Sequence, residues 1–169
     1  FIDNNLNLSS KFDEPFVYFP LHMEIERTTL IGAPYFTNQI EVIRHIIKSL
    51  PVGIRLYVKE SPAAKTREWR KISDYKEILN IPNVTLIHPS VPAKDLFENC
   101  SVVFSIAGTS GFESAFYQKP SIVFSDVGYL ALPSVRRVKT IENLPEIIGK
   151  SLETQVKSDD LDKFLQFMD

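Results

Sequence analysis

The sequence lacks the features that mark several common protein classes. It contains one cysteine, Cys100, in 169 residues, which excludes an internal disulfide framework and suits a reducing compartment. No apolar run approaches the roughly 18 residues of a membrane-spanning helix. Basic runs are missing and the net charge is −2, so we expect no nucleic-acid partner. We therefore expect a cytoplasmic protein, with peripheral attachment at the inner face of a membrane as the alternative.

Familiar ligand motifs are absent as well. The sequence GTSG at residues 108–111 lacks the GxGxxG spacing of a dinucleotide fingerprint, and no Gly-Lys-Ser/Thr follows it as in a P-loop. No His/Cys cluster has the spacing of metal ligands. We therefore expect neither a metal nor a cofactor, and a bound small molecule would be a substrate.

Short apolar runs alternate with helical patterns along the whole chain. Hydrophobic residues make up 44% of the sequence, and its length suffices for one full core. Alternation of this kind predicts an α/β fold, a Rossmann-like parallel sheet with helices on both faces, formed by residues 1–169 as a single domain. The expected strands are residues 16–21, 54–58, 84–87, 102–104 and 121–124. The expected helices are residues 38–50, 67–79, 93–99, one with Glu113 in its first turn, 141–149 and 159–168.

The segment after residues 102–104 carries the strongest ligand signal. There an apolar strand runs into a loop of small residues and then into a helix. Such a helix start offers uncovered N–H groups and a positive dipole end to an anion. Gly108 and Gly111 would let a ligand approach the main chain, while Thr109 and Ser110 would add hydroxyl groups. The pattern indicates a site for a phosphate- or sugar-bearing ligand, and the alternative is a tight turn capped by Ser or Thr.

Polar residues follow each expected strand. Since the carboxyl ends of parallel strands share one edge, these residues should line one rim, where α/β sheets bind ligands. The loops are residues 20–29, with His22 and Glu26, residues 59–62, residues 88–90, the GTSG loop, and residues 125–129, with Tyr129.

Several of these runs occur together and in order in a known family. They are YFPLHMEIERTTL at residues 18–30, LYVKESP at 56–62, PNVTLIHP at 82–89, DLFENCSVVFSIAGTSGFESAFYQKPSIVF at 95–124, and Gly128-Tyr129. In these motifs the chain resembles the capsule polysaccharide biosynthesis family, which is similar to the Kdo transferases that build capsule linkers. The resemblance implies the C-terminal, nucleotide-sugar-binding half of a GT-B glycosyltransferase. The start at FIDNN, without an initiator Met, leads us to expect a fragment that lacks the N-terminal half.

The function implied by this resemblance is sugar transfer from a nucleotide sugar, with CMP-Kdo as the implied donor, to a surface or capsular polysaccharide. This half would bind the donor and stabilise the leaving group, and it would be inactive alone. The catalytic base is not identifiable in the sequence. The alternatives are a nucleotide-sugar epimerase of GT-B architecture and a degenerate, non-catalytic GT-B binding module.

One residue departs from the family pattern. The family has Lys-Glu-His-Pro where this chain has Lys59-Glu60-Ser61-Pro62. Serine can still form hydrogen bonds, but it cannot supply an imidazolium. The substitution therefore predicts either a changed donor or lost activity.

The individual roles follow from side-chain chemistry. Lys59 could neutralise a donor phosphate, and an ion pair with a nearby carboxylate is its alternative. Glu113 could accept two hydrogen bonds from a ribose diol, with a capping-box role as its alternative. The predicted donor-binding set is Lys59, Glu60, Ser61, Pro62, Gly108, Thr109, Ser110, Gly111 and Glu113.

Four more residues are candidates to face the cleft: His22, Glu26, Arg67 and Tyr129. His22 and Glu26 could contact sugar, although a loop histidine is more often merely solvated. Arg67, with Arg70 and Lys71, is predicted to lie on a solvated helix face, and Arg67 could reach the donor.

Overall fold

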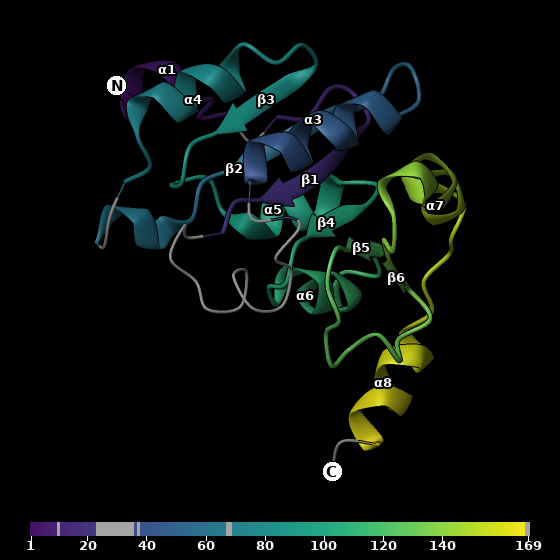
Figure 1. The fold of residues 1–169 in the computed structure, drawn as a ribbon. Coiled ribbons are helices and arrows are strands. Elements are labelled where there is room, and N and C mark those ends of the chain that lie inside the picture. The colour runs from purple at the N-terminus through teal and green to yellow at the C-terminus, as the bar shows by residue number, and fades with distance from the viewer. Residues whose placement is uncertain (10, 23–35, 37, 67–68, 168–169) are drawn as a thin grey trace.

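The order of the strands explains where this fold can bind a ligand. The structure is a computed structural model and describes residues 1–9, 11–22, 36, 38–66 and 69–167. Within that part of the chain, a six-stranded sheet has the order β3-β2-β1-β4-β5-β6, and all neighbouring strands are parallel (Figure 1). The strands are β1 (Phe16–Pro20), β2 (Arg55–Lys59), β3 (Val84–Ile87), β4 (Val103–Ser105), β5 (Ser121–Val123) and β6 (Val135–Arg137). The strand order reverses between β1 and β4, and such reversals open a crevice at the carboxyl edge of the sheet.

Helices cover both faces of the sheet. One face carries α3 (Gln39–Ser49), α4 (Ile72–Leu79) and α7 (Leu144–Leu152), and the other carries α5 (Ala93–Asn99) and α6 (Ser110–Phe116) (Figure 1). The remaining helical elements are α1 (Ile2–Asn5), η2 (Pro62–Lys65), η3 (Ile141–Asn143) and α8 (Ser158–Gln166). The predicted fold class, a Rossmann-like parallel sheet between two helical layers, is confirmed.

Alternate residues of β1 build the two halves of the core. Val17 and Phe19 pack with α3 and α4, whereas Phe16 and Tyr18 pack with α5. Successive strand side chains point to opposite faces, so a central strand buried on both sides reads as a continuous apolar run. This is why the run was recognisable as a strand in the sequence.

The N-terminal end of α3 is determined by a capping residue, Asn38. The Asn38 side chain accepts hydrogen bonds from the N–H groups of Ile40 (3.1 Å) and Glu41 (3.2 Å), which caps the helix. The inward face carries Val42, Ile43 and Ile46, all buried. The predicted helix over residues 38–50 therefore forms, within one residue at each end.

Several element boundaries differ from the prediction. The helix expected over residues 67–79 begins only at Ile72, and Trp69, Arg70 and Lys71 are not helical. The cause is tertiary, because the Arg70 side chain is held in the protein interior rather than on a helix surface. The helix predicted over residues 141–149 forms as η3 followed by α7, and the helix predicted over residues 159–168 forms as α8. Both α1 and β6 were missed, because each is too short to show a period.

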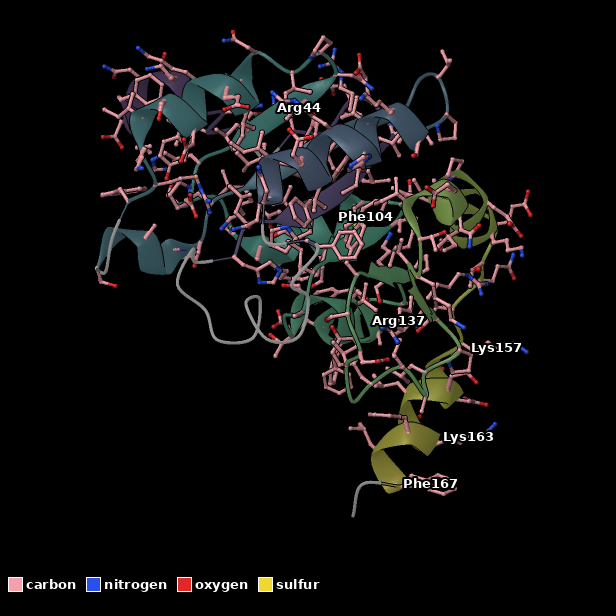
Figure 2. All side chains as sticks on the ribbon, in the orientation of Figure 1. Arg44, Phe104, Arg137, Lys157, Lys163 and Phe167 are labelled. Carbon is pink, nitrogen blue, oxygen red and sulfur yellow. The ribbon has the colours of Figure 1, made fainter. Side chains whose placement is uncertain are left out.

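The C-terminal helix extends away from the sheet. Lys163 and Phe167 point outward from it (Figure 2), and Phe167 is 92% exposed. Leu161 and Phe164 face the other way and pack beside α6, where the Phe164 ring lies 5.9 Å from that of Phe112. Among the helices that the structure describes, none is long and apolar enough to cross a bilayer.

Candidate functional site

A cavity of about 430 Å³ opens at the carboxyl ends of β1, β2 and β4. It lies at the reversal of strand order, the place where α/β sheets bind ligands. Its walls come from the three strand exits and from α5 and α6. The lining residues are Tyr18, Pro20, Leu21, His22, Lys59, Glu60, Ser61, Pro62, Ala93, Phe97, Ala107, Gly108, Thr109, Ser110 and Glu113.

The cavity brings together most of the predicted site residues. Residues 59–62, residues 108–110, Glu113 and His22 all line it. Gly111 and Tyr129 do not line it. The two other candidates, Glu26 and Arg67, lie outside the described residues. Their ligand-binding roles stay predictions.

Lys59 brings a buried cation to the cavity. It is the last residue of β2, and its Nζ donates to the carbonyl oxygen of Glu60 at 3.4 Å. An ammonium group in a site with little water attracts anions more strongly than one on the surface. The position suits a phosphate group of a ligand.

Glu60 lines the cavity, but its carboxylate is bound to the protein. Oε1 accepts the N–H of Ser61 at 2.8 Å, and Oε2 accepts the hydroxyl of Tyr75 at 2.7 Å. Oε2 also accepts Arg70 Nε at 3.3 Å. Glu60 therefore fixes the loop that carries Ser61 and has little capacity left for a ligand.

Arg70 corrects the expectation of a solvated basic face. Its side chain is buried, pairs with Glu60, and donates from Nη2 to the carbonyl oxygen of His22 at 2.9 Å. Lys71 is exposed, as expected. A buried guanidinium needs a partner, and here it links the segment before α4 to the loops after β1 and β2.

His22 is held by its backbone and by its ring. Its N–H donates to Gln39 Oε1 at 2.7 Å, and its carbonyl oxygen accepts Gln39 Nε2 at 2.9 Å. The Ile106 N–H donates to His22 Nε2 at 3.2 Å, which assigns the proton of a neutral ring to Nδ1. His22 therefore ties the loop after β1 to the loop after β4 and is not merely solvated.

The two glycines of the GTSG sequence make room for protein side chains, and Gly108 also lines the cavity. A Cβ at Gly108 would lie 2.4 Å from His22 Cε1, and one at Gly111 would lie 2.8 Å from Tyr129 Oη. Tyr129 donates its hydroxyl to the carbonyl oxygen of Gly108. Tyr129 therefore supports the loop through this hydrogen bond, and it is not among the residues that line the cavity.

Glu113 is not part of a capping box. Its Oε1 accepts the hydroxyl of Thr109 at 2.6 Å, and the Thr109 side chain caps no N–H group. The carboxylate is exposed and lines the cavity. It is thus placed to accept further hydrogen bonds there.

Sequence reasoning missed the apolar part of the cavity. Tyr18, Phe97 and Ala93 line it, and the rings of Tyr18 and Phe97 meet edge to face with centroids 5.3 Å apart. Burial, with smaller contributions from Cys100 and Glu113, raises the pKa of the Tyr18 hydroxyl. Tyr18 lies inside the strand rather than at its polar exit, so only strand register could have identified it.

No metal centre is evident in the part of the chain that the structure describes, where no group of three His, Cys, Asp or Glu residues is suitably placed. The cavity lining instead combines one lysine, one histidine, hydroxyl groups and two carboxylates. Such a set recognises phosphate and hydroxyl groups by charge and hydrogen bonding.

The family follows from a comparison of the sequence with known families. Residues 2–131 match the family described as capsule polysaccharide biosynthesis protein. The chain belongs to this family. No curated protein is significantly similar to it.

Solved structures confirm the fold. The chain is similar to KpsC, a beta Kdo 2,7 transferase of Thermosulfurimonas dismutans (TM-score 0.60, 16% identity, 83% of this chain and 46% of that one). It is also similar to a UDP-GlcNAc 2-epimerase of Methanocaldococcus jannaschii in complex with UDP-GlcNAc and UDP. The TM-score is 0.62 and the identity is 11%, over 99% of this chain and 46% of that one. A third similar structure is a UDP-forming trehalose-phosphate synthase of Burkholderia xenovorans. Its TM-score is 0.63 and its identity is 10%, over 90% of this chain and 40% of that one. The chain spans less than half of each and has the fold of one half of a GT-B protein.

Proposed function

We propose that the cavity binds the nucleotide-sugar donor of a glycosyltransferase that builds a capsular or surface polysaccharide. The observation that carries the proposal is the convergence of Lys59, Ser61, Ser110 and Glu113 on one cavity at the reversal of strand order. Family membership supports the biosynthetic role. Within the family-based proposal, CMP-Kdo is the donor to test first.

Each polar group has a part in this proposal. Lys59 offsets the negative charge of the phosphate, which grows as the nucleotide leaves. Thr109 and Ser110 stand where α6 begins, and the first N–H groups of a helix have no partner within the helix. Glu113 accepts hydrogen bonds from hydroxyl groups of the nucleoside.

The rest of the reaction belongs to a second half. We propose that residues 1–169 form one domain, and that a further GT-B domain supplies the glycan acceptor site and the catalytic base. One half of a two-domain cleft lacks contacts that form only in the transition state, so it should bind weakly and do no chemistry alone.

An epimerase is the second candidate, because the chain is also similar in fold to a UDP-GlcNAc 2-epimerase. The two activities differ in outcome: the transferase moves the sugar to an acceptor, and the epimerase only inverts one of its centres. Radiolabelled nucleotide sugar, incubated with the complete two-domain protein and acceptor glycan, separates them. No turnover of either kind would favour the degenerate binding module.

The donor-site proposal is tested by calorimetry with CMP, UDP, GDP and their sugars. Lys59→Met should weaken the best ligand about tenfold or more, since a charge-assisted contact contributes about 1.5–3 kcal/mol. Lys94→Met is the matched control, because Lys94 lies on α5 outside the cavity and pairs with Glu98 at 3.5 Å. Equal binding by the wild type and both variants would place the site elsewhere, and no binding of any nucleotide would refute the proposal.

A further inference from the structure

Among the described residues that line the cavity, Tyr18 is a buried tyrosine whose hydroxyl has no hydrogen bond to the protein. Tyr18 is 2% exposed and lines the cavity. Among the residues that the structure describes, no hydrogen bond to its hydroxyl is formed. By contrast, Tyr75 donates to Glu60, and Tyr129 donates to the carbonyl oxygen of Gly108.

The hydroxyl oxygen of Tyr18 reaches the cavity. Among the described residues, only the oxygen of Ser151 is both buried and without a hydrogen bond, so the Tyr18 oxygen keeps accessible surface, and tyrosine hydroxyls in such positions usually find a partner. The ring of Tyr18 is fixed by Phe97 on one side and by its place in β1 between β2 and β4. This packing holds the ring at the cavity that Tyr18 lines.

The neighbouring groups define what such a hydroxyl can bind. Tyr18 and Glu113 line the same cavity, and the charge of Glu113 contributes to the raised pKa of the Tyr18 hydroxyl. Burial keeps Tyr18 protonated at neutral pH, which makes it a donor, whereas the Glu113 carboxylate can only accept. A donor beside an acceptor fits a pair of neighbouring hydroxyl groups, because each hydroxyl both donates and accepts.

We infer that Tyr18 is a further ligand-binding residue, and that its hydroxyl and the Glu113 carboxylate together bind the ribose diol of the nucleotide. The inference rests on the proposed donor site and adds a specificity element to it. The Phe97 ring would lie beside the same sugar. A ribonucleotide would then be preferred over its 2′,3′-dideoxy analogue through both residues.

The test uses Tyr18→Phe, which removes one oxygen atom. Tyr57→Phe is the matched control, because Tyr57 is the β2 partner of Tyr18 in register and belongs to the same apolar cluster, but lies outside the cavity. Binding of CMP, UDP and GDP, and of the 2′,3′-dideoxy form of the best ligand, is measured by calorimetry. Thermal unfolding of each ligand-free variant is measured in parallel.

We expect Tyr18→Phe to weaken ribonucleotide binding about three- to tenfold, while dideoxynucleotide binding and the ligand-free Tm stay at the wild-type level. Tyr57→Phe should change neither affinity. A lower ligand-free Tm for Tyr18→Phe would show a structural hydroxyl and overturn the inference, as would an equal loss for both nucleotides. Unchanged ribonucleotide binding would overturn it while the donor site stands. Failure of the wild type to bind any nucleotide would overturn both.

Discussion

Arg70 and Glu60 form a buried ion pair under the candidate site, with Arg70 Nε 3.3 Å from Glu60 Oε2. Only 4% and 2% of their side-chain surfaces are exposed. The same guanidinium donates to the carbonyl oxygen of His22, and the same carboxylate accepts from Ser61 and Tyr75. One pair thus fixes the loops after β1 and β2 relative to each other, and with them two walls of the cavity.

Replacing Arg70 should be strongly destabilising. Arg70→Met leaves the Glu60 charge buried without its cation, and breaking a buried pair in this way costs about 3–5 kcal/mol. Arg44→Met is the control, because Arg44 makes partly exposed pairs with Glu41 and Glu77, for which we expect a much smaller loss. Urea unfolding of both variants measures the difference. Equal, small losses would show that Arg70 contributes little to the free energy of unfolding.

The role of Arg70 also shows where sequence reasoning fails. The periodicity of residues 67–79 favoured a helix with Arg70 on its solvated side, because a local pattern contains no information about Glu60 ten residues away. The strands and their polar exits were predictable, since apolar runs and chain order determine them. That is why residues 59–62 and 108–110 were expected to meet at one edge, as they do in the structure.

Glycines show a second limit of prediction from the sequence. Gly108 and Gly111 signal that space is needed at the main chain, and a ligand or a side chain would produce the same signal. The structure places His22 and Tyr129 in that space. Tyr18 was missed for a related reason, because a residue in the middle of a buried strand looks like core until its register against α5 is known.

Gly111→Ala should destabilise the protein by about 1–3 kcal/mol, because the new methyl group overpacks against Tyr129 and Val123. Gly149→Ala is the matched control within another helix, where a Cβ meets nothing within 4 Å. There the higher helix propensity of alanine should stabilise by up to about 1 kcal/mol. Thermal unfolding of the two variants measures both the expected loss and the expected gain of stability. Stabilisation by both substitutions would mean that Tyr129 moves aside freely.

Ser61→His restores the residue typical of the family and should raise affinity for CMP about tenfold, through a charge-assisted hydrogen bond to phosphate. The Ser61 N–H is held by Glu60 at 2.8 Å, so the loop should keep its position when the side chain changes. Ser61→Asn controls for size and polarity without charge. The gain should be larger at pH 6 than at pH 8, because an unperturbed histidine is charged below about pH 6.5. No gain for any nucleotide would mean that the loop is only a structural turn.

Stability should fall at alkaline pH because of buried acids that ionise more easily in the unfolded chain. Burial is the main cause that raises the pKa of the Cys100 thiol from 9.0 to about 12, and that of the Tyr129 hydroxyl from 10.0 to about 12. The unfolded state therefore loses these protons first, and by linkage the contribution of these groups to the free energy of unfolding is constant well below pH 9 and declines between about pH 9 and pH 12.

Cys100→Ala separates the contribution of the thiol from those of the tyrosines. It should reduce the decline throughout about pH 9 to pH 12, and its share of the slope should be largest near pH 9, before the unfolded tyrosines ionise. Tyr129→Phe should act only above about pH 10. Urea titrations at each pH measure the slopes, which are insensitive to packing losses that shift a variant by the same amount at every pH. A Cys100→Ala slope equal to that of the wild type would show that the native thiol ionises as readily as the unfolded one, against the raised pKa.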